Sequence, residues 1–348
     1  MQLLLRAGLA ATVALGCSSE PAERLAPVKE KRYADCPLVP APLPSYEFEV
    51  AGMKVKVDRG DAYVFGAGRW ELVDHLYDPD YFEKNYVVED CQIYRKDPET
   101  GARFGVRRSL SEDFARALDV RDLVGPDRGW TGFTLLSPAA PSIEAYVDLR
   151  ACILKGTCDF LDNRLDLDAD TARSGSSLRA RAVPPTPEIV TSKASLESDI
   201  LHFVRGDDVW FSGYFYVAEG KPLTLMDLES TWLKEAPGPR LMLGPDGALR
   251  VELKWTDKPT YVQAVGEELL FPLGQWVYVK VHYVLSESED GTIELWQDGS
   301  QLLSVKGRTL PLPDTILNSL EIGISANNNA EDAVVYVDDI WIGTTPEP

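Results

Sequence analysis

Short segments in which apolar and polar residues alternate follow one another from Trp130 to Gly343, with turns between them. Successive side chains of a β-strand point to opposite faces, so this alternation predicts strands with one buried face. The expected strands are 211–217, 249–255, 276–285, 292–297, 320–326 and 334–342. Asp-Gly dipeptides at 246–247 and 298–299 favour tight hairpins. We therefore expect an antiparallel β-sandwich over residues 126–348.

A smaller region, 45–125, precedes the expected sandwich. Its residues 46–50 and 53–57 alternate as strands do. Ser109 to Glu112 has the sequence of a helix capping box, and apolar residues follow with helical spacing as far as Val124, which predicts a helix over 109–125. The expected fold class is thus mainly β, with a small N-terminal α+β region. The proline-rich stretch 18–44 is predicted to be a tether.

The first 17 residues have the features of an export signal. Arg6 precedes an apolar stretch, 7–15, that is too short to span a bilayer. The stretch ends in Gly16-Cys17, which resembles the lipobox of bacterial lipoproteins, although Ala14 and Leu15 depart from the usual order. The resemblance implies cleavage before Cys17, acylation of its thiol and anchoring in the bacterial cell envelope, at the outer membrane or cell surface. The alternative is plain secretion with cleavage nearby.

The cysteine count fits an extracytoplasmic protein. If Cys17 is lipidated, four cysteines remain, and an even number suits an oxidising compartment. Cys152 and Cys158 flank a short loop that can close on itself, which favours the pairs Cys152–Cys158 and Cys36–Cys91 among three connectivities. Zinc is the rival, but no histidine lies near 152–158 in the sequence and the spacing is not Cys-x-x-Cys.

The charge excludes some partners. The formal net charge is -20 at pH 7, so no sequence-wide positive field attracts nucleic acid or an anionic lipid surface. We expect contact with a membrane through the lipid anchor alone. An acidic surface that keeps an exported protein soluble is the simpler explanation of the charge.

Several segments resemble concanavalin A-like jelly rolls. They are a Gly-x-Trp-type strand at 275–283, a hairpin with Trp-x-Asp-Gly at 291–299, a closing strand at 336–342 and an early strand at 175–179. Residues 208–216 resemble a strand of the heparin-lyase-like branch of this fold. The laminin-G-like, glucanase and polysaccharide lyase groups share it, so the resemblance implies a jelly roll and a carbohydrate ligand. It also implies a structural calcium ion at Asp338 or Asp339. No cofactor is expected to be required.

The alternation divides each strand into a core side and a solvent side. In 276–285, Val277, Val279, Val281, Tyr283 and Leu285 are predicted to face the core. If the strands are neighbours, one polar face collects the residues of the opposite side, namely Trp276, Tyr278, Lys280, His282, Arg250, Glu252, Lys254, Glu294 and Trp296. Aromatic rings stack on sugars, and ionisable groups bind their hydroxyls. The alternative is that these residues form cross-strand pairs on a solvated sheet.

This face also offers groups for β-elimination of a uronate polysaccharide. Lys280 or Arg250 would neutralise the carboxylate, His282 would take the C5 proton, and Tyr278 would protonate the leaving oxygen. Residues four apart on a strand lie roughly 13 Å apart, so Tyr278 and His282 do not reach one bond together, and Tyr214 or Tyr216 is an alternative acid.

We predict from the sequence a lipid-anchored, extracytoplasmic carbohydrate-binding protein, with a polysaccharide or cell-surface glycan as its partner. The first alternative is a polysaccharide lyase acting on uronate-containing glycans. The second is a structural surface protein that binds a protein partner.

Overall fold

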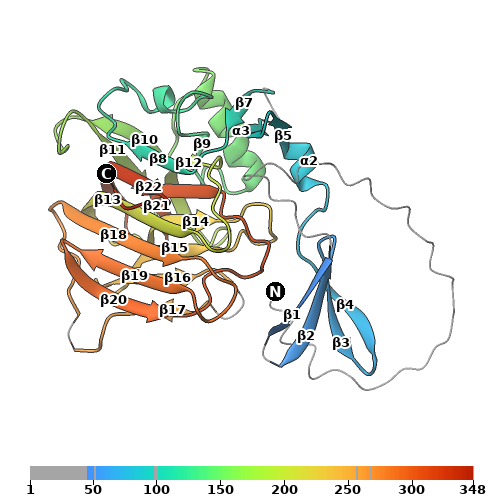
Figure 1. The fold of residues 1–348 in the computed structure, drawn as a ribbon. Helices are drawn as coiled ribbons and strands as arrows, with labels where there is room; N and C mark the ends of the chain where they lie inside the picture. The colour runs from blue at the N-terminus through green and yellow to red at the C-terminus, as the bar shows by residue number, and fades with distance from the viewer. Residues whose placement is uncertain (1–44, 51, 98–100, 256–257, 267, 348) are drawn as a thin grey trace. The chain divides into compact units, whose positions relative to one another are not determined.

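A computed structural model describes residues 45–347 except 51, 98–100, 256–257 and 267. The chain divides into two compact units, Met1–Ile93 and Tyr94–Pro348. The described part of the first unit is a four-stranded antiparallel meander, followed by a short helix and a strand (Figure 1). The elements are β1 (Ser45–Val50), β2 (Met53–Asp58), β3 (Asp61–Gly66), β4 (Arg69–His75), α2 (Tyr81–Asn85) and β5 (Tyr86–Glu89). The strands predicted at 46–50 and 53–57 are confirmed as β1 and β2.

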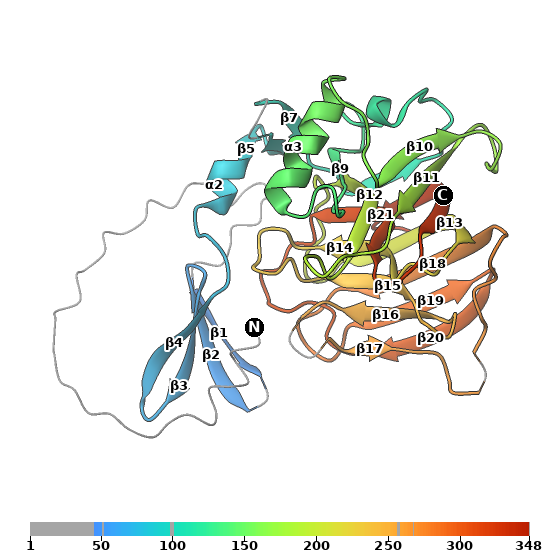
Figure 2. The ribbon, with the colours of Figure 1, turned by 180° about the vertical axis from the view of Figure 1, so that it is seen from behind.

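The second unit is a sandwich of two antiparallel sheets, which confirms the predicted fold class (Figures 1 and 2). One sheet, here called the β22 sheet, has the order β10-β11-β22-β13-β18-β19-β20, and β8 pairs with the second half of β22. Its strands are β8 (Ser109–Glu112), β10 (Arg164–Asp168), β11 (Ser177–Ala182), β13 (Asp208–Glu219), β18 (Val277–Val284), β19 (Thr292–Gln297), β20 (Ser300–Lys306) and β22 (Ala333–Gly343).

The other sheet, the β21 sheet, has the order β17-β16-β15-β14-β21-β12-β9. Its strands are β9 (Gly132–Thr134), β12 (Ser192–Ser198), β14 (Thr224–Glu229), β15 (Pro239–Leu243), β16 (Leu249–Leu253), β17 (Thr260–Tyr261) and β21 (Ser319–Asn327). Helix α3 (Ile143–Leu154) lies beside β9 at the edge of this sheet (Figure 2). The remaining elements are β6 (Gln92–Lys96), which pairs with β7 (Arg103–Gly105), and the short 3-10 helix η1 (Val120–Leu123).

The core lies between the two sheets and has the period-two pattern predicted from the sequence. Val277, Val279, Val281 and Tyr283 of β18 are fully buried. The β21 strand contributes Leu320, Ile322 and Ile324 in the same way, and β13 contributes Phe211 and Phe215. At the predicted Asp-Gly turn, Asp298 and Gly299 both have positive φ and join β19 to β20, as a tight hairpin requires.

Two features of the helices differ from expectation. The helix predicted over 109–125 is wrong, because Ser109–Glu112 is strand β8, whose backbone pairs with Ile340–Gly343. Phe114 then has a φ of 54°, which ends any helical continuation. Conversely, α3 was not predicted, although Ser142 caps it by accepting a hydrogen bond from the Ala145 amide. Tertiary pairing therefore overrode the local capping signal at 109–112.

The predicted disulfide between Cys152 and Cys158 is present, with Cα atoms 5.5 Å apart at the end of α3. Cys91 is also disulfide-bonded, and Cys36, its predicted partner, lies outside the described residues, as do Cys17 and the 18–44 stretch. None of the helices that the structure describes is both long and apolar enough to cross a membrane.

Candidate functional site

The predicted single polar face is divided between two sheets. The side chains of β16, β18 and β19 alternate as expected, with Val251, Val281 and Leu295 buried in the core. However, β16 belongs to the β21 sheet, whereas β18 and β19 belong to the β22 sheet. Outward side chains of the two sheets point to opposite sides of the sandwich. The prediction that Arg250, Glu252 and Lys254 share a face with Tyr278, Lys280, His282, Glu294, Trp276 and Trp296 is therefore wrong.

The outer face of the β22 sheet is here called the β22 face. On it, the His282 ring has a partner at each ring nitrogen and a third partner against its plane. Its Nδ1 lies 2.9 Å from a Glu294 carboxylate oxygen and its Nε2 lies 3.0 Å from Asp208. Its ring stacks on Trp210 with the centroids 3.9 Å apart. Both ring nitrogens thus already have carboxylate partners, and a base needs a free nitrogen directed at its substrate.

The aromatic side chains of the β22 face contact one another across neighbouring strands. The Tyr214 and Tyr278 rings lie 4.9 Å apart, and Trp276 meets Tyr216 edge to face at 5.7 Å. The Lys280 ammonium lies 4.4 Å from the centre of the Trp296 ring. These contacts are the cross-strand pairs that were the predicted alternative to a sugar-binding face. Such pairs stabilise a sheet.

The outer face of the β21 sheet, here the β21 face, has a straight row of ionisable residues. The register places Glu197 of β12 opposite Glu321 of β21, Glu321 opposite Asp227 of β14, and Asp227 opposite Arg240 of β15. Arg240 in turn pairs with Glu252 of β16. Five adjacent strands therefore contribute one charged side chain each, and residues paired in this way have Cβ atoms about 5 Å apart.

Ion pairs connect this row to cations beside it. Lys193 Nζ lies 3.3 Å from Glu321 Oε2, and Arg150 Nη1 of α3 lies 3.0 Å from Glu197 Oε2. Lys254 donates to Glu229, and Arg240 donates to Glu252. The side chains of Glu229 and Glu321 are 7% and 8% exposed. A cluster with this much charge and this little solvent contact is expensive to bury, which makes it a candidate for function.

Burial changes the ionisation of the cluster. It raises the pKa of Glu229 to about 7, although Lys254 opposes the rise. Burial also raises the pKa of Glu321, against the opposing charge of Lys193. Burial acts to lower the pKa of Lys193, but the surrounding carboxylates, Glu321 first, outweigh it and leave this pKa above its usual range. Near neutral pH, Lys193 therefore stays cationic, while Glu229 is poised to exchange a proton.

Several buried polar atoms of the β21 face have no hydrogen-bond partner in the part of the chain that the structure describes. They are Asp227 Oδ1, Arg240 Nε, Arg250 Nε and Thr224 Oγ1. Most buried polar groups in proteins are paired, and an unpaired one points to a partner such as water or a ligand. Water or a polar ligand on this face would satisfy these atoms, and an unpaired atom of the same kind is also found in the β22 sheet, at Arg179 Nε.

Tyr146 of α3 extends the cluster. Burial raises the pKa of its phenol, and the charges of Glu197 and Glu321 raise it further, so the group stays protonated. The sequence patterns did not single out Tyr146, Lys193, Glu197, Asp227, Glu229, Arg240 and Glu321. The available signal was a set of charged residues at outward positions of strands, such as Lys193 and Glu197 in β12 and Asp227 and Glu229 in β14.

The two acidic residues considered for calcium lie in an irregular part of β22. Asp338 is fully buried, and its carboxylate accepts hydrogen bonds from the Arg173 and Asp339 amides. Asp339 forms an ion pair with Arg173, with 3.0 Å between Nε and Oδ2. Within the described ranges, no three acidic, histidine or cysteine residues are grouped to hold a metal. Calcium at this position stays a prediction.

A comparison with family models identifies the wider relationship. Residues 149–341 match the model described as polysaccharide lyase. The chain belongs to this family. The matched segment contains Arg150, Lys193, Asp227, Glu229 and Glu321, as well as the aromatic residues of the β22 face. A search of curated proteins found no match.

Several solved structures are similar to the chain. A fungal endo-β-1,4-glucuronan lyase from Trichoderma reesei is 12% identical, with 54% of this chain and 90% of that chain covered, at a TM-score of 0.42. A mutant of alginate lyase Aly36B in complex with alginate tetrasaccharide is 12% identical, with 69% and 98% covered, at 0.40. Cellulose-induced protein Cip1 is 18% identical, with 55% and 89% covered, at 0.40.

Proposed function

We propose that the protein is a polysaccharide lyase that cleaves uronate-containing glycans by β-elimination at the β21 face. The buried row of charges from Glu197 to Glu252 carries this proposal, because it lies in the segment that matches the lyase family. The sequence-based alternative of a lyase therefore replaces simple carbohydrate binding as the preferred function.

In the reaction, a base removes the proton at C5 of the uronate. The electron pair of that bond forms the C4–C5 double bond, the C4–O glycosidic bond breaks, and the leaving oxygen takes up a proton. Negative charge accumulates on the carboxylate side of the sugar, where a cation stabilises it. The reaction needs no metal or redox partner to balance its atoms and electrons.

Three groups of the β21 face fit these roles. Lys193, held as a cation among carboxylates, neutralises the uronate carboxylate. Glu229, with a pKa of about 7, is the base, because a base is most effective when its pKa is near the working pH. Tyr146, whose pKa is raised by burial, remains a protonated donor for the leaving oxygen.

The test is incubation of the purified protein with uronate polymers while the ultraviolet absorbance of unsaturated sugar ends is followed. We expect an increase with the wild type and none with Lys193→Met or Glu229→Gln. A glycan that is retained in affinity gels but never cleaved would contradict the lyase proposal and favour carbohydrate binding. The aromatic side chains of the β22 face support that second candidate function. Neither cleavage nor retention would favour the third class, a protein that binds a protein partner.

We also propose that a lipid on Cys17 anchors the protein in a bacterial envelope. The Cys152–Cys158 disulfide supports an oxidising compartment. Cys17→Ser should release the protein into the soluble fraction, and continued membrane association of that variant would contradict lipidation.

A further inference from the structure

Segment 344–347 follows β22 and lies on the β22 face. The Glu347 carboxylate accepts two hydrogen bonds at Oε2, from Tyr278 Oη at 2.8 Å and from Ser212 Oγ at 2.9 Å. Trp341 Nε1 donates to the Thr345 carbonyl at 3.1 Å. Residues 344–347 form no strand, and Thr345, Pro346 and Glu347 are exposed. Hydrogen bonds from side chains thus hold an exposed carboxylate on a rigid sheet.

The two donors belong to fixed positions on central strands. Ser212 of β13 is buried and lies opposite Lys280 of β18, while Tyr278 lies opposite Tyr214. Burial raises the pKa of Tyr278 to about 12, and the Glu347 carboxylate adds to the rise. Tyr278 therefore remains a donor at any physiological pH. A pair of preset hydroxyl donors suits a carboxylate oxygen, since hydrogen bonds to charged acceptors are the stronger kind.

Two cationic residues contact or neighbour the residues that surround this position. Lys280 is the cross-strand neighbour of Ser212. The Arg173 guanidinium lies 3.4 Å from the centre of the Tyr214 ring, and Tyr214 in turn contacts the Tyr278 ring. Arg173 is also paired with Asp339, and the Lys280 ammonium lies over the Trp296 ring. The direct partners of the Glu347 carboxylate are therefore the hydroxyls of Ser212 and Tyr278.

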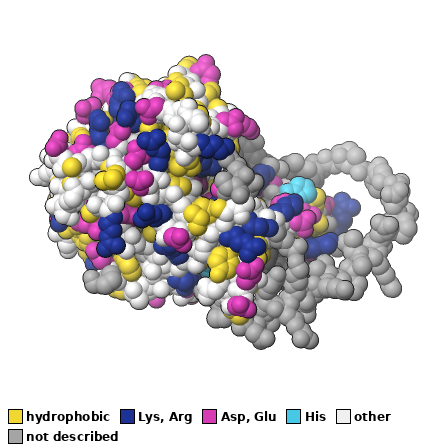
Figure 3. Space-filling view, turned by 90° about the horizontal axis from the view of Figure 1, so that it is seen from above, with side chains coloured by type: hydrophobic (Ala, Val, Ile, Leu, Met, Phe, Trp, Pro, Cys, Tyr) yellow, Lys and Arg dark blue, Asp and Glu magenta, His cyan; other side chains and the backbone are white. Residues whose placement is uncertain are grey.

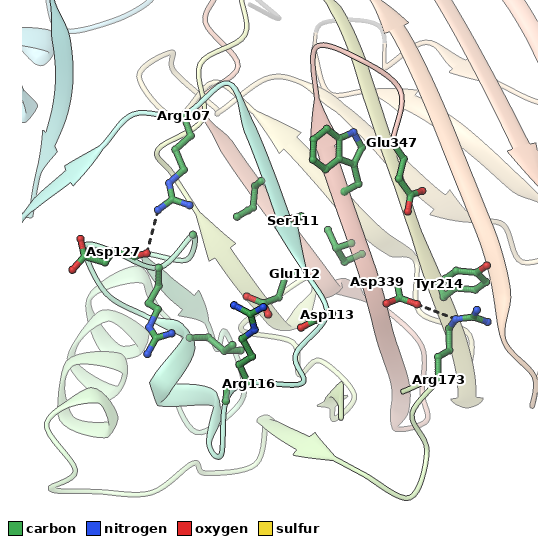
Figure 4. Close-up of a pocket in the computed structure, with 17 residues that line it drawn as sticks. Arg107, Ser111, Glu112, Asp113, Arg116, Asp127, Arg173, Tyr214, Asp339 and Glu347 are labelled. Atoms are coloured by element: carbon green, nitrogen blue, oxygen red, sulfur yellow. Dashed lines mark hydrogen bonds and ion pairs between the residues drawn. The ribbon is translucent and has the colours of Figure 1, made fainter. Parts of the chain in front are cut away.

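A hollow of about 740 Å³ opens beside Glu347, within the size range of sugar-sized ligand sites. Figure 4 shows Arg107 and Arg116 on one side of it, and Arg173, Tyr214 and Glu347 on the other. Figure 3 shows basic and acidic side chains interspersed over the visible surface of the molecule, without a large field of one sign.

We propose that Ser212 and Tyr278 form a binding position for the carboxylate of an acidic sugar, and that Glu347 occupies this position as a displaceable internal ligand. The sugar ring would extend into the adjacent hollow, against Tyr214 and Trp341. This position is on the β22 face, across the sandwich from the β21 face, so it would hold a uronate chain without taking part in its cleavage. The proposal does not depend on the lyase activity.

The test uses monosaccharides, which have no glycosidic bond to cleave. Binding of D-galacturonate, D-galactose and galactose 6-sulfate to the full chain is followed by tryptophan fluorescence, since Trp341 and Trp296 lie on this face. Galactose lacks only the carboxylate, and galactose 6-sulfate tests for a general anion site. The variants are Glu347→Ala alone and in combination with Tyr278→Phe or Ser212→Ala, which remove one hydroxyl each. Glu347→Ala with Tyr216→Phe is the matched control, because Tyr216 is a tyrosine of the same face whose ring contacts Trp276 and Tyr336.

We expect Glu347→Ala to bind galacturonate more tightly than the wild type, because the internal competitor is gone. Adding Tyr278→Phe or Ser212→Ala should weaken that binding about tenfold, as loss of a hydrogen bond to a charged group does. The Tyr216→Phe control should bind like Glu347→Ala. The proposal is overturned if Glu347→Ala gives no gain, if the two hydroxyl deletions leave the affinity unchanged, or if galactose or galactose 6-sulfate binds as well as galacturonate.

Discussion

The Lys193 ammonium lies 3.3 Å from the Oε2 atom of Glu321, and both side chains are largely removed from solvent on the outer face of the β21 sheet. Glu321 also accepts a hydrogen bond from the buried Ser195 hydroxyl at 3.0 Å. The pair is therefore fixed in place, and a substrate carboxylate that approaches Lys193 would compete with Glu321 for the same cation. Lys193 therefore has two roles, pairing with Glu321 and neutralising the substrate carboxylate. Mutations can distinguish them, because the first affects stability and the second affects activity.

Replacing Lys193 by Met leaves the Glu321 carboxylate buried without its cation. We expect the free energy of unfolding to fall by about 3–5 kcal/mol, as when one partner of a buried pair is removed. The double variant Lys193→Met/Glu321→Gln has no unpaired charge and should recover most of this stability, measured by denaturant unfolding. It should remain inactive if Lys193 neutralises the substrate. Recovery of both stability and activity would show that Lys193 is purely structural.

The proposed base predicts a specific pH profile. With a pKa of about 7 for Glu229, lyase activity should rise with pH through this value as the carboxyl group loses its proton. Glu229→Gln should lower turnover by at least about 100-fold and abolish that limb of the profile. Glu287→Gln, an equivalent change in an exposed ion pair with Arg205, is the control and should leave the profile unaltered. An unchanged limb in Glu229→Gln would assign the proton transfer to another residue.

Stability should depend on pH through the same residue. An unfolded glutamate has a pKa of about 4.3, whereas folded Glu229 has one of about 7. Between these values the folded state binds more protons than the unfolded state, so the free energy of unfolding falls as pH rises across this window. Asp338, with a pKa raised by burial to about 6, contributes in the same direction. Melting temperatures measured from pH 4.5 to 8 should decline, and less steeply for Glu229→Gln; an equal slope would refute the assignment.

Replacing His282 tests which of the two outer faces carries the catalytic residues. His282→Gln removes the stacking on Trp210 and at least one of the two carboxylate contacts, which should lower the free energy of unfolding by about 1–2 kcal/mol. Turnover on uronate polymers should stay at the wild-type level, because the reaction is assigned to the opposite face. A variant that keeps its stability but loses turnover would instead place the base on the β22 face.

Much of the fold was accessible from local patterns. Period-two alternation identified the strands and the buried sides of β16, β18 and β19, because a side chain's direction in a strand depends only on its position along that strand. The turn at Asp298 and Gly299 was likewise recognisable, since its backbone geometry restricts the residues that fit. Local signals failed at Ser109–Glu112, where pairing with Ile340–Gly343 replaced a helix start by a strand.

What the sequence by itself determined is therefore which side of each strand is apolar, where the chain turns, and that the C-terminal part forms a sandwich. Only the tertiary structure decided which sheet each strand joins, and this choice placed Arg250 and His282 on opposite sides of the molecule. It also aligned Glu197, Asp227 and Glu321, which come from strands far apart in the chain, in one row. The physical reason is that strand partners are chosen by long-range packing and hydrogen bonding, which leave no periodic trace in the order of residues.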